Sequence, residues 1–175
     1  MAETIWWSEL HDKLGTFGFA SSERGLLTLL LPNSVAKRDR IIRRLAPGAR
    51  IVPDDEGRNA EAMRQVREYL AGERKTFDLV LDQRGSDFQI AVWRAVYEVP
   101  WGETVSYGEI ARRIGFPDAA QAVGAANGAN PHPLIVPCHR IIGSDGSLVG
   151  FGGGLALKEA LLALEGRPMQ LGLAL

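Results

Sequence analysis

The chain has 175 residues, enough for one domain or two small ones around a real hydrophobic core. Its 46% hydrophobic and 23% charged residues are ordinary for a globular protein. The longest apolar run, residues 25–32, is too short to span a bilayer, and the acidic first four residues do not resemble a signal peptide. The net charge of −1 neither favours nor excludes a nucleic-acid partner.

Residues 1–81 alternate between strand-like and helix-like segments, which indicates a small α/β domain with an antiparallel sheet. In chain order, the pattern first predicts a hairpin of residues 16–20 and 25–31. A helix follows, which begins at the N-cap residues Asn33 and Ser34 and ends at Pro47-Gly48. Then come a strand at 51–52, a helix from Ala60 to Leu70 that ends at Gly72, and a strand at 77–81. Residues 82–85 have the composition of a linker, so we expect domains of residues 1–85 and 86–175.

The first predicted helix carries a run of basic residues: Lys37, Arg38, Arg40, Arg43 and Arg44. These side chains could contact phosphates, although a solvated helix face is the commoner explanation for such a run. Residues 86–175 contain six basic and eight acidic residues, a net charge of −2. If this part of the chain binds DNA, it must rely on helix N-termini, backbone amides and shape more than on a basic field.

From Ser86 the pattern changes to helices and glycine-rich loops. Capping boxes at Ser86-x-x-Gln89 and Ser106-x-x-Glu109 predict two helix starts. A tight turn at residues 116–118 then leads into a helix of residues 119–127, which together with the preceding helix fits a helix-turn-helix. The last of these helices consists almost wholly of small side chains. Such a surface suits close approach to a groove wall and suits tight helix packing equally well.

Cys138 is the only cysteine, which excludes an internal disulfide and a cysteine-rich zinc site and fits a reducing cytoplasm. A cysteine is nucleophilic as the thiolate, and the adjacent His139 and Arg140 offer a base and a positive charge. A buried structural thiol explains the Cys–His pair equally well. Glu165 ends a predicted helix of residues 155–164, where its charge opposes the helix dipole. It is either a solvated surface residue or the third member of a Cys–His–Glu relay.

Several motifs between Phe88 and Gly166 occur together at specific spacing. They are Phe88-Gln89 with Val92-Trp93, Pro100-Trp101-Gly102-Glu103-Thr104-Val105-Ser106-Tyr107, Ala122-Val123-Gly124, Gly128-Ala129-Asn130-Pro131, Pro137-Cys138-His139-Arg140 and Gly152-Gly153-Gly154-Leu155. This set resembles the O6-alkylguanine-DNA alkyltransferases, also called methylated-DNA–protein-cysteine methyltransferases. The resemblance implies a ribonuclease H-like N-terminal α/β domain. It also implies a mostly α C-terminal domain with a winged helix-turn-helix, which binds double-stranded DNA in the minor groove and flips the alkylated guanine into a pocket.

The resemblance also implies residue roles. Cys138 would attack the alkyl carbon, His139 would take the thiol proton through a water, and Glu165 would orient His139. Tyr107 would contact the phosphate backbone and donate to guanine N3, and Asn130 would brace the thiolate loop. The pocket would include the Cys138 carbonyl, Pro133, Ile141, Phe151, Gly152 and Gly153, and the DNA-binding residues would be Ala120, Gln121, Ala122, Gly124, Ala125 and Arg140. The thioether product limits each molecule to one turnover, with no cofactor, metal or obligate protein partner, and O4-alkylthymine is a candidate second substrate.

Two positions depart from the family pattern. Gln121 stands where the family usually has an arginine that fills the gap of the flipped base, and Asp118-x-x-Gln121 is itself a capping-box pattern. We therefore expect weaker DNA binding than with arginine. Gly152 replaces a serine that some relatives carry, which predicts room for bulkier adducts. The N-terminal zinc cysteines of some members are missing, so no structural zinc is expected.

Three other functions compete with alkyl transfer. A non-catalytic alkyltransferase-like module would flip the base without chemistry, but such modules replace the cysteine that this chain has as Cys138. A cysteine hydrolase would need an oxyanion hole, and its cysteine and histidine are not normally adjacent in sequence. A transcription factor that used only the helix-turn-helix is disfavoured by the acidic C-terminal half.

Overall fold

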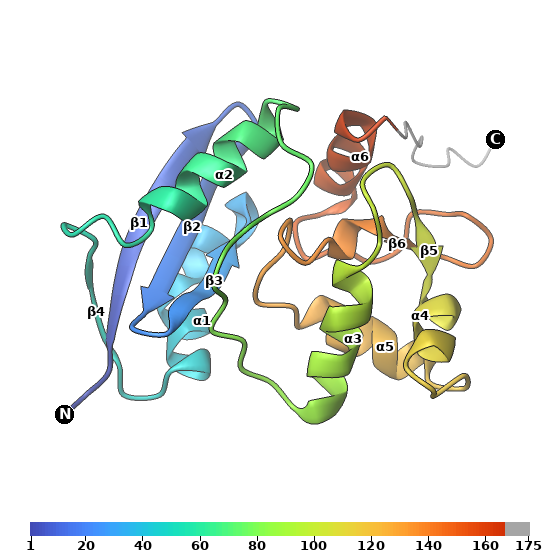
Figure 1. Ribbon diagram of the computed structural model, residues 1–175, viewed down its shortest axis with the longest axis horizontal. Coiled ribbons are helices and arrows are strands. Elements are labelled where there is room, and N and C mark those ends of the chain that lie inside the picture. The colour runs from blue at the N-terminus through green and yellow to red at the C-terminus, as the bar shows by residue number, and fades with distance from the viewer. Residues whose placement is uncertain (167–175) are drawn as a thin grey trace. The chain divides into compact units, whose positions relative to one another are not determined.

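The computed structural model describes residues 1–166, which form two compact units with the division between Arg84 and Gly85. The first unit contains a four-stranded sheet in the order β3-β2-β1-β4 (Figure 1), formed by β1 (Thr4–Asp12), β2 (Gly15–Ser22), β3 (Gly25–Leu30) and β4 (Arg50–Pro53). Strands β1, β2 and β3 pair antiparallel, whereas β4 pairs parallel to β1. The sheet is therefore mixed, and the expectation of a purely antiparallel sheet is wrong.

Two helices cover opposite faces of this sheet, α1 (Arg38–Leu45) and α2 (Ala60–Leu70) (Figure 1). Ile42 of α1 packs in the cluster that contains Trp7 and Ala20, which are paired across β1 and β2. The next residue of β2, Ser21, points the other way and donates a hydrogen bond of 2.6 Å to Asn59 at the start of α2. Because both faces are covered, the central strands are apolar on both sides.

Two details of this unit differ from the sequence-based expectation. Asn33 and Ser34 do not cap an α-helix, because the chain first forms a 3-10 turn, η1 (Pro32–Lys37), and α1 begins only at Arg38. Residues 77–81 do not form a strand: they make one isolated parallel bridge, between Leu81 and Leu26. Their apolar character is explained by Phe77, which is buried against Tyr69 with ring centroids 5.4 Å apart.

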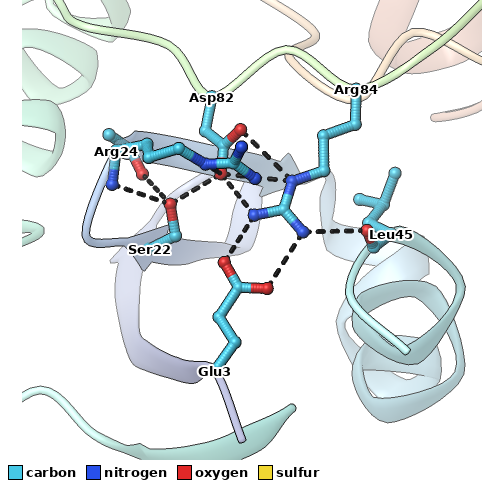
Figure 2. A network of polar contacts seen from close by, with 7 residues as sticks. Glu3, Ser22, Arg24, Leu45, Asp82 and Arg84 are labelled. Carbon is cyan, nitrogen blue, oxygen red and sulfur yellow. Dashed lines mark hydrogen bonds and ion pairs between the residues drawn. The ribbon is translucent and has the colours of Figure 1, made fainter. Parts of the chain in front are cut away.

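Asp82 and Arg84 are fixed to the first unit, so this segment is not a free linker (Figure 2). Asp82 is buried and accepts a hydrogen bond of 2.6 Å from Ser22. Arg84 donates to Glu3 at 2.6 Å and to the Leu45 carbonyl at 3.1 Å, and it pairs with Asp82 at 2.6 Å. The network joins the residue before β1, the end of β2, the end of α1 and the last residues of the unit.

The second unit is mostly helical, with a two-stranded parallel sheet (Figure 1). Its elements are α3 (Asp87–Tyr97), β5 (Val105–Ser106), α4 (Tyr107–Arg113), α5 (Ala120–Gly128), η2 (Cys138–Arg140), β6 (Ile141–Ile142) and α6 (Leu155–Leu164). The capping box at Ser86 and Gln89 is confirmed, and Ser106 caps α4 by accepting from the Glu109 amide at 3.1 Å. Helices α3, α4 and α5 pack against one another. Within residues 1–166, no helix is long and apolar enough to cross a membrane.

Candidate active site

Cys138 begins the short helix η2 and is 6% exposed. Directly after η2, strand β6 pairs with β5 in the register Val105 to Ile141 and Ser106 to Ile142. Ser106 is also the cap of α4, whose first residue is Tyr107. This short parallel pair therefore fixes the position of Tyr107 relative to the cysteine, and the two groups lie close enough for their charges to interact.

Two asparagines hold the loop before the cysteine. Asn130 donates to the Val136 carbonyl at 2.9 Å and accepts from the His132 amide at 2.9 Å, as expected of a brace. Asn127, which the sequence did not single out, donates to the Cys138 carbonyl at 3.3 Å from the buried side of α5. Between them, Leu134 is buried with a φ of 71°, a conformation that is costly for a residue with a branched side chain. The loop geometry is thus imposed by its surroundings.

Glu165 is the C-cap residue of α6, is 3% exposed and faces the cysteine helix. Its Oε1 lies 2.8 Å from Nε2 of His139, and both of its oxygens accept from Arg140, at 2.9 and 2.8 Å. A carboxylate bound to Nε2 favours the tautomer in which Nε2 carries the proton and Nδ1 carries the lone pair. The Cys–His–Glu arrangement expected from the sequence therefore comes together in the fold, and Glu165 is not a solvated surface residue.

Arg140, which the sequence predicts to contact DNA, points into the protein interior in this structure. Its side chain is buried, forms a two-point contact with Glu165 and donates to the Val99 carbonyl at 2.5 Å. The guanidinium offsets the negative charge of Glu165 at the end of α6, where the helix dipole alone would disfavour it. Arg140, two residues after the cysteine, therefore compensates the charge of Glu165, and the sequence alone does not show this pairing.

Lys158 is a residue of the site that was not predicted from the sequence. It is completely buried on α6 and its ammonium group donates to the carbonyls of Ile141, Val149 and Gly150 at 2.5, 2.9 and 3.4 Å. Burial lowers its pKa to about 8, while the nearby Cys138 thiolate acts in the opposite direction. A signal was present in the sequence, because Lys158 shares one helical face with the buried Leu161 and Leu162. A charged residue on an apolar face needs partners.

The electrostatics of the site keep the resting cysteine neutral. Burial raises the pKa of the Cys138 thiol to about 11, and this rise is opposed by the Asn130 side chain and the Lys158 charge. Burial also lowers the pKa of His139, partly offset by Glu165. At neutral pH the site therefore holds a thiol next to a neutral imidazole. Such a pair is able to pass one proton from sulfur to nitrogen when the thiolate is needed.

The predicted substrate-binding residues fall into two groups. Pro133 and Ile141 are buried beside the cysteine loop, whereas Phe151, Gly152 and Gly153 lie in a half-buried to exposed loop before α6. The Tyr107 hydroxyl donates to the Val149 carbonyl at 3.2 Å, which attaches this loop to the start of α4. Lys158 binds the same carbonyl from the other side. The loop of residues 149–153, which we call the lid, is therefore held at Val149 by two hydrogen bonds.

Helix α5 presents the predicted DNA-binding face to solvent. Gln121, Ala122 and Ala125 are exposed, and Ala120 and Gly124 are half-buried. The capping box that Asp118 and Gln121 suggested does not form, because the N-cap residue is Ala119 and no side chain caps it. Gly124 lies against the Tyr107 ring, since a Cβ at this position would be 3.7 Å from it. No group of three or more His, Cys, Asp or Glu side chains within residues 1–166 could hold a metal ion.

Comparisons with known proteins point to one family. Residues 87–167 match the family model described as 6-O-methylguanine DNA methyltransferase, DNA binding domain. The chain is 42% identical over 165 residues to the inducible methylated-DNA–protein-cysteine methyltransferase of Bacillus subtilis, which covers 94% of this chain and 92% of that protein. It is 59% identical over 108 residues to the methyltransferase of Mycolicibacterium paratuberculosis, a match that spans 66% of that protein's length.

Solved structures give the same result over more than nine tenths of the chain. The O6-methylguanine methyltransferase of Mycobacterium tuberculosis has a TM-score of 0.79 at 41% identity, with 97% of each chain covered. A structure described as Mycobacterium tuberculosis OGT in complex with DNA has a TM-score of 0.79 at 42% identity, with 91% of this chain and 92% of that chain covered. From its buried cysteine site, its sequence relatives and its fold, the chain belongs to the methylated-DNA–protein-cysteine methyltransferase family.

Proposed function

We propose that this protein repairs O6-alkylguanine in double-stranded DNA by moving the alkyl group to Cys138. The sulfur forms a bond to the alkyl carbon as the carbon–O6 bond breaks, and the thiol proton ends on the released guanine. The thioether is not hydrolysed, so each molecule acts once, and no cofactor or protein partner takes part. The observation that carries the proposal is the buried Cys138 beside His139, which Glu165 binds at 2.8 Å.

Ionisation of the thiol is the first task of the site. A pKa of about 11 means that forming the thiolate at pH 7 costs roughly 5 kcal/mol before substrate binds. His139 takes the proton at Nδ1 through a water, because its Nε2 is bound to Glu165. Lys158 and Asn130 favour the thiolate, since both lower the pKa of Cys138. Proton transfer is thereby coupled to alkyl transfer and the resting thiol is protected from other reactions.

The other predicted residues bind and orient the base. The carbonyls of Cys138 and Ile141 accept from the guanine amino group, the Gly152 amide faces O6, and Pro133 lines the pocket together with the lid residues Phe151 and Gly153. Tyr107 donates to guanine N3 as the leaving base gains charge. Its hydroxyl already lies at the lid, 3.2 Å from the Val149 carbonyl. A pocket bounded by this lid fits a flipped base rather than a base inside the duplex.

DNA binds to the exposed face of α5. Gln121, Ala122 and Ala125 would enter the minor groove, and the small side chains of the two alanines allow the close approach that this groove requires. We infer a winged helix-turn-helix formed by α4, α5 and the turn at residues 143–147. For the first unit we infer a ribonuclease H-like fold, which the sheet order β3-β2-β1-β4 with a parallel β4 supports.

Intact mass spectrometry after incubation with an O6-methylguanine duplex tests the proposal. We expect a gain of one methyl group in the wild type and no gain in Cys138→Ala. An O4-methylthymine duplex tests the second substrate in the same way. If the reduced wild-type protein binds the damaged duplex but gains no mass, the chain is a recognition module without chemistry. If it neither binds nor gains mass, the proposed function is wrong.

A further inference from the structure

Helix α1 carries an exposed basic surface in the N-terminal unit. Lys37, Arg40, Arg43 and Arg44 are all exposed, and we call these four residues the α1 basic face. The opposite side of the helix is packed into the core through the buried Ile42. Spacings of three and four residues place the four cations on one side of the helix. The neighbouring Arg38 is excluded because it pairs with Asp39 at 2.7 Å and stacks over Trp7.

The α1 basic face differs from the other arginines by its lack of acidic partners. Within residues 1–166, none of the ion pairs includes any of these four residues. The arginines that do pair with carboxylates are Arg24, Arg38, Arg58, Arg64, Arg74, Arg84, Arg112, Arg113 and Arg140. Four adjacent unpaired cations repel one another, which has a cost unless a negative partner is present.

Helix stability does not explain this arrangement. A cation in the last turn is favoured by the helix dipole, which accounts for Arg43 and Arg44. Lys37 is both the last residue of η1, where a cation is favoured, and the N-cap of α1, where it is not; Arg40 in the first turn of α1 lies at the end where the dipole disfavours a positive charge. The only acidic residue of that turn is Asp39, and Arg38 occupies it. The dipole of α1 therefore disfavours Arg40 and gives no net reason for Lys37.

The two units differ in charge, and this difference indicates which partner the four cations of the α1 basic face have. Residues 1–84 carry fourteen basic and thirteen acidic residues, whereas residues 85–175 carry six and eight. Among residues 85–166, Arg112 and Arg113 pair with Glu109, and Arg140 and Lys158 are buried, which leaves Arg94 as the one exposed cation without a carboxylate partner. DNA affinity depends largely on cations that neutralise phosphates. The unit with the α5 face therefore supplies few of them.

We propose that the α1 basic face is a second DNA-binding surface, which contacts phosphates of the duplex without reading sequence. This inference rests on the proposed function, because it takes double-stranded DNA as the partner of the protein. Arginine is suited to the contact, since its planar guanidinium donates two parallel hydrogen bonds to one phosphate. An open hollow of about 460 Å³, lined by residues 35–40, lies at the Lys37 end of the face.

Salt-dependent binding to an undamaged duplex tests this proposal. We expect Arg40→Ala/Arg43→Ala/Arg44→Ala to lower the slope of log K against log salt concentration by about 0.9 for each phosphate that is no longer neutralised. For each such phosphate, the affinity should fall about tenfold at about 50 mM salt and about fourfold at about 200 mM. Lysine at the same three positions should keep most of the slope. Fluorescence anisotropy with a labelled duplex measures both quantities.

A matched control removes three exposed cations elsewhere in the same unit, Lys13→Ala/Arg67→Ala/Lys75→Ala. If the control weakens binding as much as the α1 variant, or if the α1 variant keeps the wild-type slope, the proposal is wrong and the face serves another partner. Methyl transfer from an O6-methylguanine duplex at a saturating concentration, followed by intact mass spectrometry, separates the two claims. A wild type without transfer contradicts the proposed function, whereas normal transfer with unchanged DNA binding in the α1 variant contradicts only this inference.

Discussion

Lys158 and Glu165 lie seven residues apart on the same buried face of α6, with Leu161 and Leu162 between them. Lys158 binds the Ile141 carbonyl just after the cysteine helix, and Glu165 binds His139 and Arg140 inside it. One helix thus holds the short segment from Cys138 to Ile141 with a cation at one point and an anion at another. Buried charges of this kind are costly without partners, and here each has several.

The titration of Lys158 makes a prediction about stability. Its folded-state pKa of about 8 lies below its ordinary value of 10.5, so the unfolded chain binds more protons between these two pH values. The free energy of unfolding that is linked to this residue should therefore rise with pH in that window, by up to roughly 3 kcal/mol. Urea unfolding at about pH 7.5 and about pH 10 measures it.

The comparison is made in a Cys138→Ala background, so that the thiol does not titrate in the same range. Protein with Lys158 should gain stability over Lys158→Met as the pH rises. A difference between the two proteins that is independent of pH would show that the buried ammonium does not titrate there.

Glu165 and Arg140 act in opposite directions on His139. Glu165 raises the pKa of His139 and Arg140 lowers it, both against the larger effect of burial. Arg140→Met should therefore move the acid limb of the pH–rate profile for alkyl transfer to higher pH, and Glu165→Gln should move it to lower pH. Glu165→Gln should also cost about 3–5 kcal/mol of stability, because it leaves the Arg140 charge buried without a partner.

Single-turnover transfer from free O6-benzylguanine at a series of pH values measures these shifts, and urea unfolding measures the stability. Glu159→Gln on the same helix is the control, since Glu159 is only half-buried and takes part in no ion pair within residues 1–166. Shifts of the same sign in Arg140→Met and Glu165→Gln would contradict the assignment of His139 as the base.

Local signals in the sequence predicted part of this fold well. The Ser86 capping box, the helix that ends before Glu165 and the hairpin of β2 and β3 each follow from residues within one turn or one strand pair. Strand β1 was not predicted, because Ile5, Trp6 and Trp7 are all buried and show no alternation of apolar and polar residues. The alternation is missing because two helices cover opposite faces of the sheet, and this arrangement is a property of the tertiary structure.

The active-site residues also divide into those that local motifs predict and those that only the tertiary structure reveals. Cys138, His139, Asn130 and Tyr107 could be named from motifs, and the fold brings them together with Glu165. The partnership of Arg140 with Glu165 spans 25 positions of sequence and could not be inferred from either residue alone. Arg140 was therefore assigned to DNA, where exposed arginines usually bind. The apolar face around Lys158 signals that this residue needs partners, but the partners are backbone carbonyls without a sequence signature, so the sequence does not link Lys158 to the site.

Gly152 in the lid should permit large alkyl groups. A Cβ at this position would have no heavy atom within 4 Å, so Gly152→Ser is expected to fold without strain. The added side chain should narrow the pocket entrance and lower the rate on O6-benzylguanine relative to O6-methylguanine by several-fold to about tenfold. Transfer rates on duplexes with each adduct measure the ratio. A wild type that strongly prefers the methyl adduct would contradict the prediction.

Gln121→Arg should strengthen DNA binding, because Gln121 is exposed on α5 and is not used as a helix cap. An arginine there would fill more of the gap left by a flipped base and would add a positive charge in the minor groove. We expect about tenfold tighter binding at about 50 mM salt and a salt slope that is steeper by about 0.9. Anisotropy with an O6-methylguanine duplex and with its undamaged counterpart measures both. Gln121→Ala is the control and should bind more weakly than the wild type to the damaged duplex. If arginine leaves the affinity unchanged or lowers it, the side chain at this position does not enter the groove, and the exposed face of α5 meets DNA in another register.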